Sequence, residues 1–268
     1  MKFLSSVPQI FLTVLIFSYI QTAAANNVEK LKKCDDLLNK YDEKLSNYSY
    51  SFDREDQDEL RASIDELEPL SGEEKVPPEL YFCLYGLYVL TEDEKHTLIS
   101  LNKYISVSEP EPMLYYLSSV HNQEMGNMAE ALEQINAGIA LNDTLPHYFN
   151  KRAEINYELG NHTKALDDVS KEMQIQGGQS IDIDFHFLHA KILMSLKQYE
   201  RAITVLTDNI ILIDSLFPSG KGGYFVPRVE NYNLLMKAYC EINDRDTAAS
   251  VYENTKDYQP QASKPKCL

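Results

Sequence analysis

Three prolines, Pro78, Pro112 and Pro146, stand 34 residues apart. Neighbouring residues recur at the same distance, namely Met125-Gly126-Asn127 with Leu159-Gly160-Asn161, and Ala131-Leu132 with Ala165-Leu166. A fixed period of this length is typical of stacked repeats, in which each unit buries its apolar face against the next. Such stacks usually present a binding surface rather than an active site. The period therefore constrains both the fold and the kind of function.

Apolar residues at three- and four-residue spacing predict helices along most of the chain. Residues 26–75 are expected to form a helical hairpin, with helices over about 26–49 and 55–68, that lacks the repeated motif and caps the stack. Pairs of helices follow, and each of the three spaced prolines fits the first turn of a helix, where its missing N–H is not needed. The expected repeats cover about 78–111, 112–145, 146–182, 183–215 and 228–260, and residues 261–268 form a tail.

These residues resemble the tetratricopeptide-repeat (TPR) family, over roughly 78–260. The strongest matches are small residues where the two helices of a repeat cross, namely Ala131, Ala165, Ala202 and Ala248 with Ser119, Ala153 and Ala190. A bulky side chain there forces the helices apart. Tyr85 and Met236 stand where the family has small residues. The resemblance implies an all-α fold, a right-handed superhelical solenoid of TPR-like helix pairs with an N-terminal capping hairpin.

The first 25 residues are interpreted as an export signal. Lys2 precedes an apolar run from Ile10 to Ile20, which is too short to span a bilayer, and Ala23-Ala24-Ala25 offers a small-residue cleavage site. We therefore expect a periplasmic or secreted protein that is cleaved after Ala25 and is not inserted in the membrane.

Export gives the four cysteines a context, since disulfides persist in oxidising compartments. Three pairings are possible; Cys34 with Cys83 and Cys240 with Cys267 are favoured, and free buried thiols remain an alternative. Three Asn-X-Ser/Thr triplets, at Asn47, Asn142 and Asn161, are about as many as chance provides, so the sequence alone says nothing about glycosylation.

The formal net charge of −16 argues against nucleic-acid partners, because an acidic chain is repelled by phosphates. In the TPR family the first helix of each repeat lines the concave face. Its binding positions carry over to the following partner-binding residues here: Phe82, Val89, Met113, Tyr116, Val120, Gln123, His147, Asn150, Glu154, Tyr157, Phe187, Lys191, Met194, Asn233 and Lys237. Some of these side chains are alternatively expected to pack on the N-terminal hairpin or the tail.

The sequence shows no nucleophile elbow, zinc-protease helix or kinase signature. We therefore predict a non-enzymatic scaffold or adaptor, without a cofactor, that binds a protein or peptide and serves an envelope or extracellular complex. The alternative is an all-helical metal-binding protein or enzyme that uses the 216–227 loop with His186 and His189, which stand three residues apart on a predicted helix.

Overall fold

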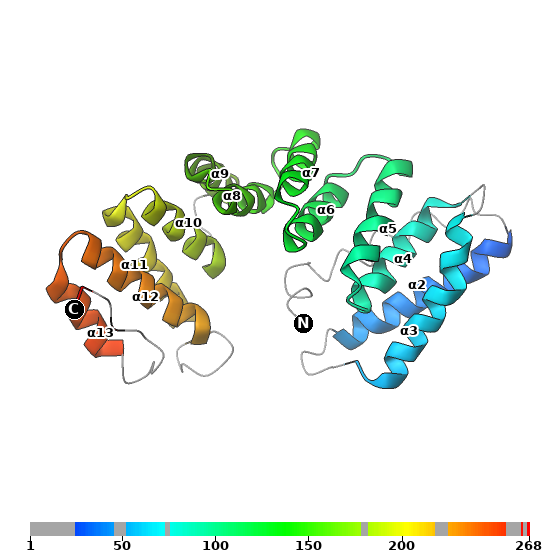
Figure 1. Ribbon diagram of the computed structural model, residues 1–268, viewed down its shortest axis with the longest axis horizontal. Helices are drawn as coiled ribbons and strands as arrows, with labels where there is room; N and C mark the ends of the chain where they lie inside the picture. The colour runs from blue at the N-terminus through cyan, green and yellow to red at the C-terminus, as the bar shows by residue number, and fades with distance from the viewer. Residues whose placement is uncertain are drawn as a thin grey trace. The chain divides into compact units, whose positions relative to one another are not determined.

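The computed structural model describes residues 25–45, 52–72, 76–177, 182–217, 225–255, 264, 267 and 268, although not the side chains of 25–28, 43, 45 and 225–227. Within these ranges the regular structure is entirely helical, and no helix there is long and apolar enough to cross a membrane. The expected export signal (apart from Ala25) and residues 218–224 of the 216–227 loop lie outside the described residues. The chain forms two compact units, Met1–Leu141 and Asn142–Leu268 (Figure 1).

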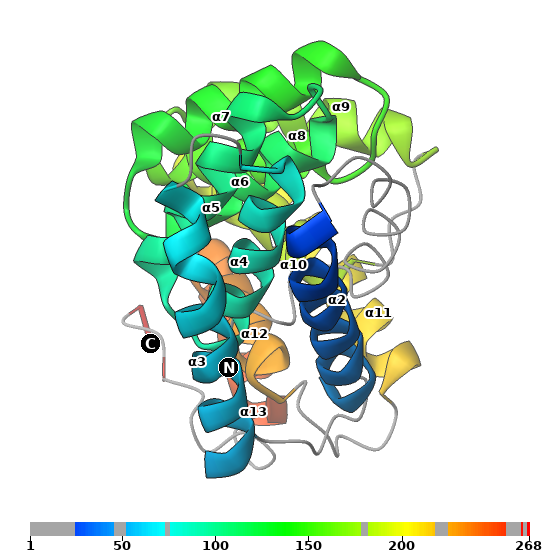
Figure 2. The same cartoon turned by 90° about the vertical axis from the view of Figure 1, so that its right-hand side faces the viewer.

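The first unit contains α2 (Ala25–Leu45), α3 (Arg54–Leu67), the 3₁₀ turn η1 (Glu68–Gly72), α4 (Pro78–Leu90), α5 (Glu94–Val107), α6 (Pro112–Glu124) and α7 (Met128–Leu141). Here α2 and α3 pack on α4 through one apolar core that includes Leu38, Leu60 and Leu84 (Figure 2). A second core joins α4, α5 and α6. Nearly every side chain of α4 from Leu80 to Tyr88 is therefore buried, because this helix is packed on several sides.

The second unit contains α8 (Tyr148–Glu158), α9 (His162–Ile175), α10 (Ile183–Ser195), α11 (Tyr199–Leu216), α12 (Phe225–Glu241) and α13 (Arg245–Thr255). One core joins α8, α9 and α10 around Val169, Phe185 and Ile192, and another joins α10, α11 and α12 around Leu206 and Leu235. Each helix pair thus contributes to the core of the next pair, as expected for stacked repeats.

The small residues expected at helix crossings are all buried, and Ala131, Ala153, Ala165, Ala190, Ala202 and Ala248 have no exposed surface. Tyr85, which replaces a small residue, is also buried. Its hydroxyl lies 3.2 Å from Nε2 of His121 on α6, and the two rings meet edge to face. Burial lowers the pKa of His121 to about 4, so this imidazole is neutral at pH 7. The larger side chain is accommodated because it packs with an aromatic partner.

The turns inside the repeats share one geometry. The residue after the C-cap of the first helix has a left-handed φ in every turn. The N–H of the next residue donates to the backbone carbonyl five residues earlier, at 2.8–3.0 Å. The left-handed residues are Glu92, Gly126, Gly160, Lys197 and Asn243. Glycine adopts this conformation without cost, whereas Glu92 and Lys197 adopt it against their preference.

Both favoured disulfides are present. Cys34 on α2 is bonded to Cys83 on α4, with their Cα atoms 6.3 Å apart, and both cysteines are buried. Cys240 on α12 is bonded to Cys267 near the C-terminus, with a Cα separation of 5.9 Å. The first bond fixes the N-terminal hairpin to the first repeat, and the second fixes the end of the tail to the last one.

Candidate binding site

The structure places the binding positions of the first unit mainly within its core. Phe82 is 8% exposed and Val120 is 3% exposed. The Phe82 ring lies 5.1 Å from the ring of Tyr104 on α5, and Val89 and Met113 pack on the same core. Phe82 and Val120 are therefore structural side chains and are not available to a ligand. The physical reason is that α4 and α6 pack against each other and against α5, so apolar residues along the seam are enclosed.

Gly86 shows that the N-terminal hairpin also covers α4. A Cβ atom added to Gly86 would lie 2.9 Å from the side-chain methyl groups of Leu38 on α2. Gly86 stands between Phe82 and Val89 on the expected binding face of this helix. The alternative that part of this face packs on the hairpin therefore holds for α4. Of the remaining positions in this unit, Tyr116 and Gln123 are half-buried.

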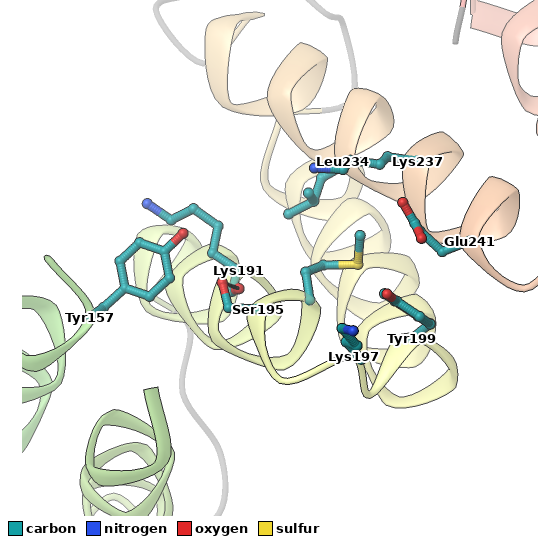
Figure 3. A pocket seen from close by; sticks show the side chains of 9 residues that line it. Tyr157, Lys191, Ser195, Lys197, Tyr199, Leu234, Lys237 and Glu241 are labelled. Carbon is teal, nitrogen blue, oxygen red and sulfur yellow. Dashed lines mark hydrogen bonds between the residues drawn. The ribbon is translucent and has the colours of Figure 1, made fainter. Parts of the chain in front are cut away.

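The second unit contains a pocket of about 250 Å³ (Figure 3). Four of the sequence-predicted residues line it, namely Tyr157, Lys191, Met194 and Lys237. The other lining residues, which the sequence did not identify, are Ser195, Lys197, Tyr199, Leu234 and Glu241. The predicted residues His147, Asn150, Glu154, Phe187 and Asn233 are outside this lining. The pocket is the candidate binding site.

Helical spacing brings the lining residues together. Lys191, Met194 and Ser195 share a face of α10 because residues three and four apart are neighbours on a helix. Leu234, Lys237 and Glu241 do the same on α12, and α8 contributes Tyr157. Lys197 comes from the turn between α10 and α11, where its left-handed conformation reverses the chain, and Tyr199 is the first residue of α11. Figure 3 shows Tyr157 beside Lys191, and Leu234, Lys237 and Glu241 along another helix.

Lys191 is held between two aromatic rings. Its Nζ lies 5.3 Å from the centre of the Tyr157 ring and 5.2 Å from that of Phe187. Aromatic faces attract an ammonium group within about 6 Å, so both rings favour this position of the charge. Phe187 therefore acts on the pocket through Lys191. On the same helix, desolvation and the nearby Asp182 raise the pKa of Asp184, while the Lys191 charge opposes this rise.

The pocket has the opposite charge to the chain as a whole. Three lysines and one glutamate line it, whereas the chain carries a net charge of −16. Lys191, Lys197 and Lys237 form no ion pair with a carboxylate of the described residues. Desolvation, followed by the charge of Glu241 and a hydrogen bond to it, raises the pKa of Tyr199. This site favours an anionic ligand with some apolar surface.

A polar network positions α8, which carries Tyr157. The guanidinium of Arg152 donates to both carboxylate oxygens of Asp168 on α9, with Nη2 2.7 Å from Oδ1 and Nε 3.1 Å from each oxygen. Asn156 also donates to Asp168, at 3.0 Å. Asp168 is buried, so this bidentate contact fixes α8 against α9 in a defined register.

Glu172 closes the N-terminal end of α8. Its side chain has no exposed surface, and its carboxylate accepts the backbone N–H groups of His147, at 2.7 Å, and Asn150, at 3.3 Å. Gln176 donates to the same carboxylate at 2.7 Å. These N–H groups have no partner within the helix, and the helix dipole favours a negative charge at this end. His147 and Asn150 are thus partly engaged in structure through their backbones.

His186 and His189, the two histidines of the alternative hypothesis, lie in different environments. His189 is buried, and desolvation, with smaller effects of Arg201 and His186, lowers its pKa to about 4. The His186 ring packs edge to face with Phe185. Among the described residues, no group of three or more His, Cys, Asp and Glu side chains is arranged to hold a metal ion. Nothing in the described part of the site favours metal chemistry.

The fold is that of known TPR proteins. A tetratricopeptide-repeat protein from Parabacteroides merdae superimposes with a TM-score of 0.58 and 17% identity, over 85% of this chain and 77% of that one. Pseudomonas aeruginosa PilF superimposes with a TM-score of 0.56 and 15% identity, over 87% and 95%. YrrB, described as a TPR protein with an unusual peptide-binding site, gives 0.54 and 12%, over 75% and 93%.

The prediction of an all-α TPR-like fold is therefore confirmed. No family model and no curated protein matches the sequence. The likeness lies in the fold, since identities of this size do not carry function from one protein to another.

Proposed function

We propose that this protein is an exported scaffold that binds a partner protein through the pocket of its second unit. The partner contributes an extended segment that combines acidic side chains with an apolar or aromatic one. The observation that carries this proposal is the set of three lysines, free of ion pairs with described carboxylates, around a pocket that Tyr157, Met194 and Leu234 make partly apolar. The peptide-binding description of YrrB, which shares the fold, supports the same class of ligand.

The positive charge of the pocket explains how the protein would select an acidic partner segment. Because the rest of the chain is strongly acidic, an acidic segment is repelled elsewhere on the surface and attracted here. The Tyr157 ring and the Met194 side chain offer the aromatic and adaptable contacts that are common at interface cores. An assembly or regulatory role in an envelope or extracellular complex is the cellular setting that we infer from the expected leader.

The test uses the purified chain without residues 1–25, with both disulfides formed. Binding is measured by fluorescence anisotropy with two labelled peptide pools. One pool contains random sequences of Glu, Asp, Phe and Leu, and in the other Lys replaces Glu and Asp. We expect the acidic pool to bind and its affinity to fall as salt is added. Equal binding of the two pools, or preference for the lysine pool, would overturn the proposal.

Two matched pairs of variants locate the site. We expect Lys237→Glu to weaken binding of the acidic pool about tenfold, on the order of 1.4 kcal/mol, and Lys164→Glu, an exposed lysine on α9, to leave it unchanged. Tyr157→Ala is expected to weaken binding, whereas Tyr116→Ala, at a predicted binding position of the first unit, is not. If Tyr116→Ala had the larger effect, the site would lie in the first unit instead.

A further inference from the structure

The second unit begins with Asn142-Asp143-Thr144, a triplet that has the form of an N-glycosylation acceptor. Oδ1 of Asn142 accepts hydrogen bonds from the backbone N–H of Thr144, at 3.0 Å, and from its hydroxyl, at 2.7 Å. Both bonds use the carbonyl oxygen of the asparagine side chain. Within the described residues, the Nδ2 amide of Asn142 has no partner. The nitrogen that carries a sugar in N-linked glycans is therefore not needed to hold the loop.

The surroundings of Asn142 have room for a large substituent. Asp143, Thr144, Pro146 and His147 are exposed, and Leu141, at the preceding helix end, is 46% exposed. Asn142 itself is half-buried, and the apolar core clusters given for the described part of the chain do not include it. A glycan is bulky and hydrophilic, so it has to extend from such a surface loop into solvent.

Asn161 provides a contrast, although Asn161-His162-Thr163 has the same form. Its side-chain Nδ2 donates to Oδ1 of the buried Asn156, at 3.5 Å, and its backbone carbonyl accepts the N–H of Ala165, at 3.0 Å. Asn127 occupies the equivalent turn and bonds to Asn122 in the same way, without being part of such a triplet. The Nδ2 of Asn161 therefore takes part in the turn of the repeat, whereas the Nδ2 of Asn142 has no partner among the described residues.

We propose that Asn142 carries an N-linked oligosaccharide in the exported protein, and that Asn161 does not. The proposal rests on the export that is part of the proposed function. The pairing of the four cysteines in two disulfides fits an oxidising compartment, which secreted chains enter. In the reaction, Nδ2 of Asn142 loses a proton and bonds to the anomeric carbon of an oligosaccharide. The sugar donor is a polyprenyl-pyrophosphate oligosaccharide, and the polyprenyl pyrophosphate leaves with the bonding electron pair.

The test expresses the full chain with its own leader in cultured eukaryotic cells, in an Asn47→Gln background that removes the remaining triplet. Peptide-N-glycosidase treatment in ¹⁸O-labelled water, followed by mass spectrometry, marks each asparagine that carried a glycan. We expect the label at Asn142 alone and a mass decrease of one oligosaccharide. Asn142→Gln and Thr144→Ala are expected to abolish the decrease, whereas Thr144→Ser and Asn161→Gln are expected to preserve it.

Each other outcome overturns the proposal in an identifiable way. A secreted chain without a glycan at Asn142 would refute the site but leave export intact, and a label at Asn161 would refute the structural contrast. An unglycosylated chain retained in the cytosol would refute export and with it the modification. Peptide binding is measured on unglycosylated protein, so it stands or fails independently of these results.

Discussion

Helices α4 and α10 occupy equivalent places in two repeats, yet the equivalent surface is covered on α4 and lines a pocket on α10. Phe82, Gly86 and Val89 on α4 correspond to Phe187, Lys191 and Met194 on α10. In the first unit Gly86 lies under Leu38 of the N-terminal hairpin, and Phe82 is enclosed in the core. In the second unit Lys191 and Met194 line a pocket. The same repeat position can therefore serve packing or binding, depending on which elements lie beside it.

The two regions are also stabilised differently. On α4, an apolar core and the buried Cys34–Cys83 bond hold the covering hairpin in place. On α8, beside the pocket, the fixing contacts are the Arg152–Asp168 pair and the Glu172 carboxylate. Apolar packing leaves little polar surface for recognition. A hydrogen-bonded network also fixes the position of a helix, but charged groups remain near it. This difference suggests four experiments.

The largest effect is expected from removing the disulfide that fixes the hairpin. The Cys34→Ser, Cys83→Ser double variant opens a loop of 49 residues, for which the chain-entropy relation gives a loss of about 4 kcal/mol. Hydrogen exchange should show α2 and α3 opening from α4 before the rest of the unit. The matched variant Cys240→Ser, Cys267→Ser should leave exchange of α2 unchanged. Equal loosening of α2 in both variants would contradict a local role for the first bond.

The next effect concerns the support of the pocket. Asp168→Ala leaves the guanidinium of Arg152 without its bidentate partner, and breaking a buried pair typically costs about 3–5 kcal/mol. Because Arg152 retains some exposure, we expect the lower end, about 3 kcal/mol, in urea unfolding of the second unit. Arg152→Met with Asp168→Leu should recover much of the loss. No recovery would mean that the pair, together with the bond from Asn156 to Asp168, contributes more than an apolar contact of similar size.

A smaller loss is expected where the hairpin covers α4. Gly86→Leu introduces a side chain where even a Cβ meets Leu38 at 2.9 Å, and overpacking of this kind costs about 1–3 kcal/mol. The better helix propensity of Leu offsets somewhat less than 1 kcal/mol, so we expect a net loss of about 1–2 kcal/mol in thermal unfolding. Gly72→Leu, where a Cβ meets nothing within 4 Å, is the control for adding an apolar side chain.

The smallest expected effect comes from a substitution that raises stability but weakens binding. Lys197→Gly relieves a left-handed conformation and should stabilise the second unit by about 0.5–1 kcal/mol, while it removes one positive charge from the pocket and weakens binding of the acidic peptide pool. Glu92→Gly changes the same turn position outside the pocket. We expect it to raise the melting temperature without changing the affinity. A loss of affinity in both variants would show that the turns, rather than the charge, control binding.

Particular residues show which features of the structure could be predicted from the sequence. The 34-residue period predicted the helix pairs, and Ala165 and Ala202 lie at buried crossings as the pattern requires. The favoured cysteine pairs are those that the structure contains. Four of the predicted binding residues line the pocket, and their role in binding stays a prediction. Lys197 and Tyr199 also line it but were not predicted, because the binding pattern was taken from the first helix of each repeat. Alignment of the turns offered a signal, since a lysine stands where two earlier repeats have glycine.

The sequence by itself determined the repeat, the position of its turns and the small residues at helix crossings. These features depend on a short-range pattern that recurs in every repeat. Only the tertiary structure decided which exposed helix faces remain exposed. Phe82 and Phe187 are the same residue at the same repeat position, and sequence spacing cannot separate them. Phe82 is enclosed in the core of α4, α5 and α6, whereas Phe187 is only partly buried against the core of α10, α11 and α12 and lies beside Lys191. They differ because burial depends on the elements that pack alongside, and those contacts join residues that are distant in the chain.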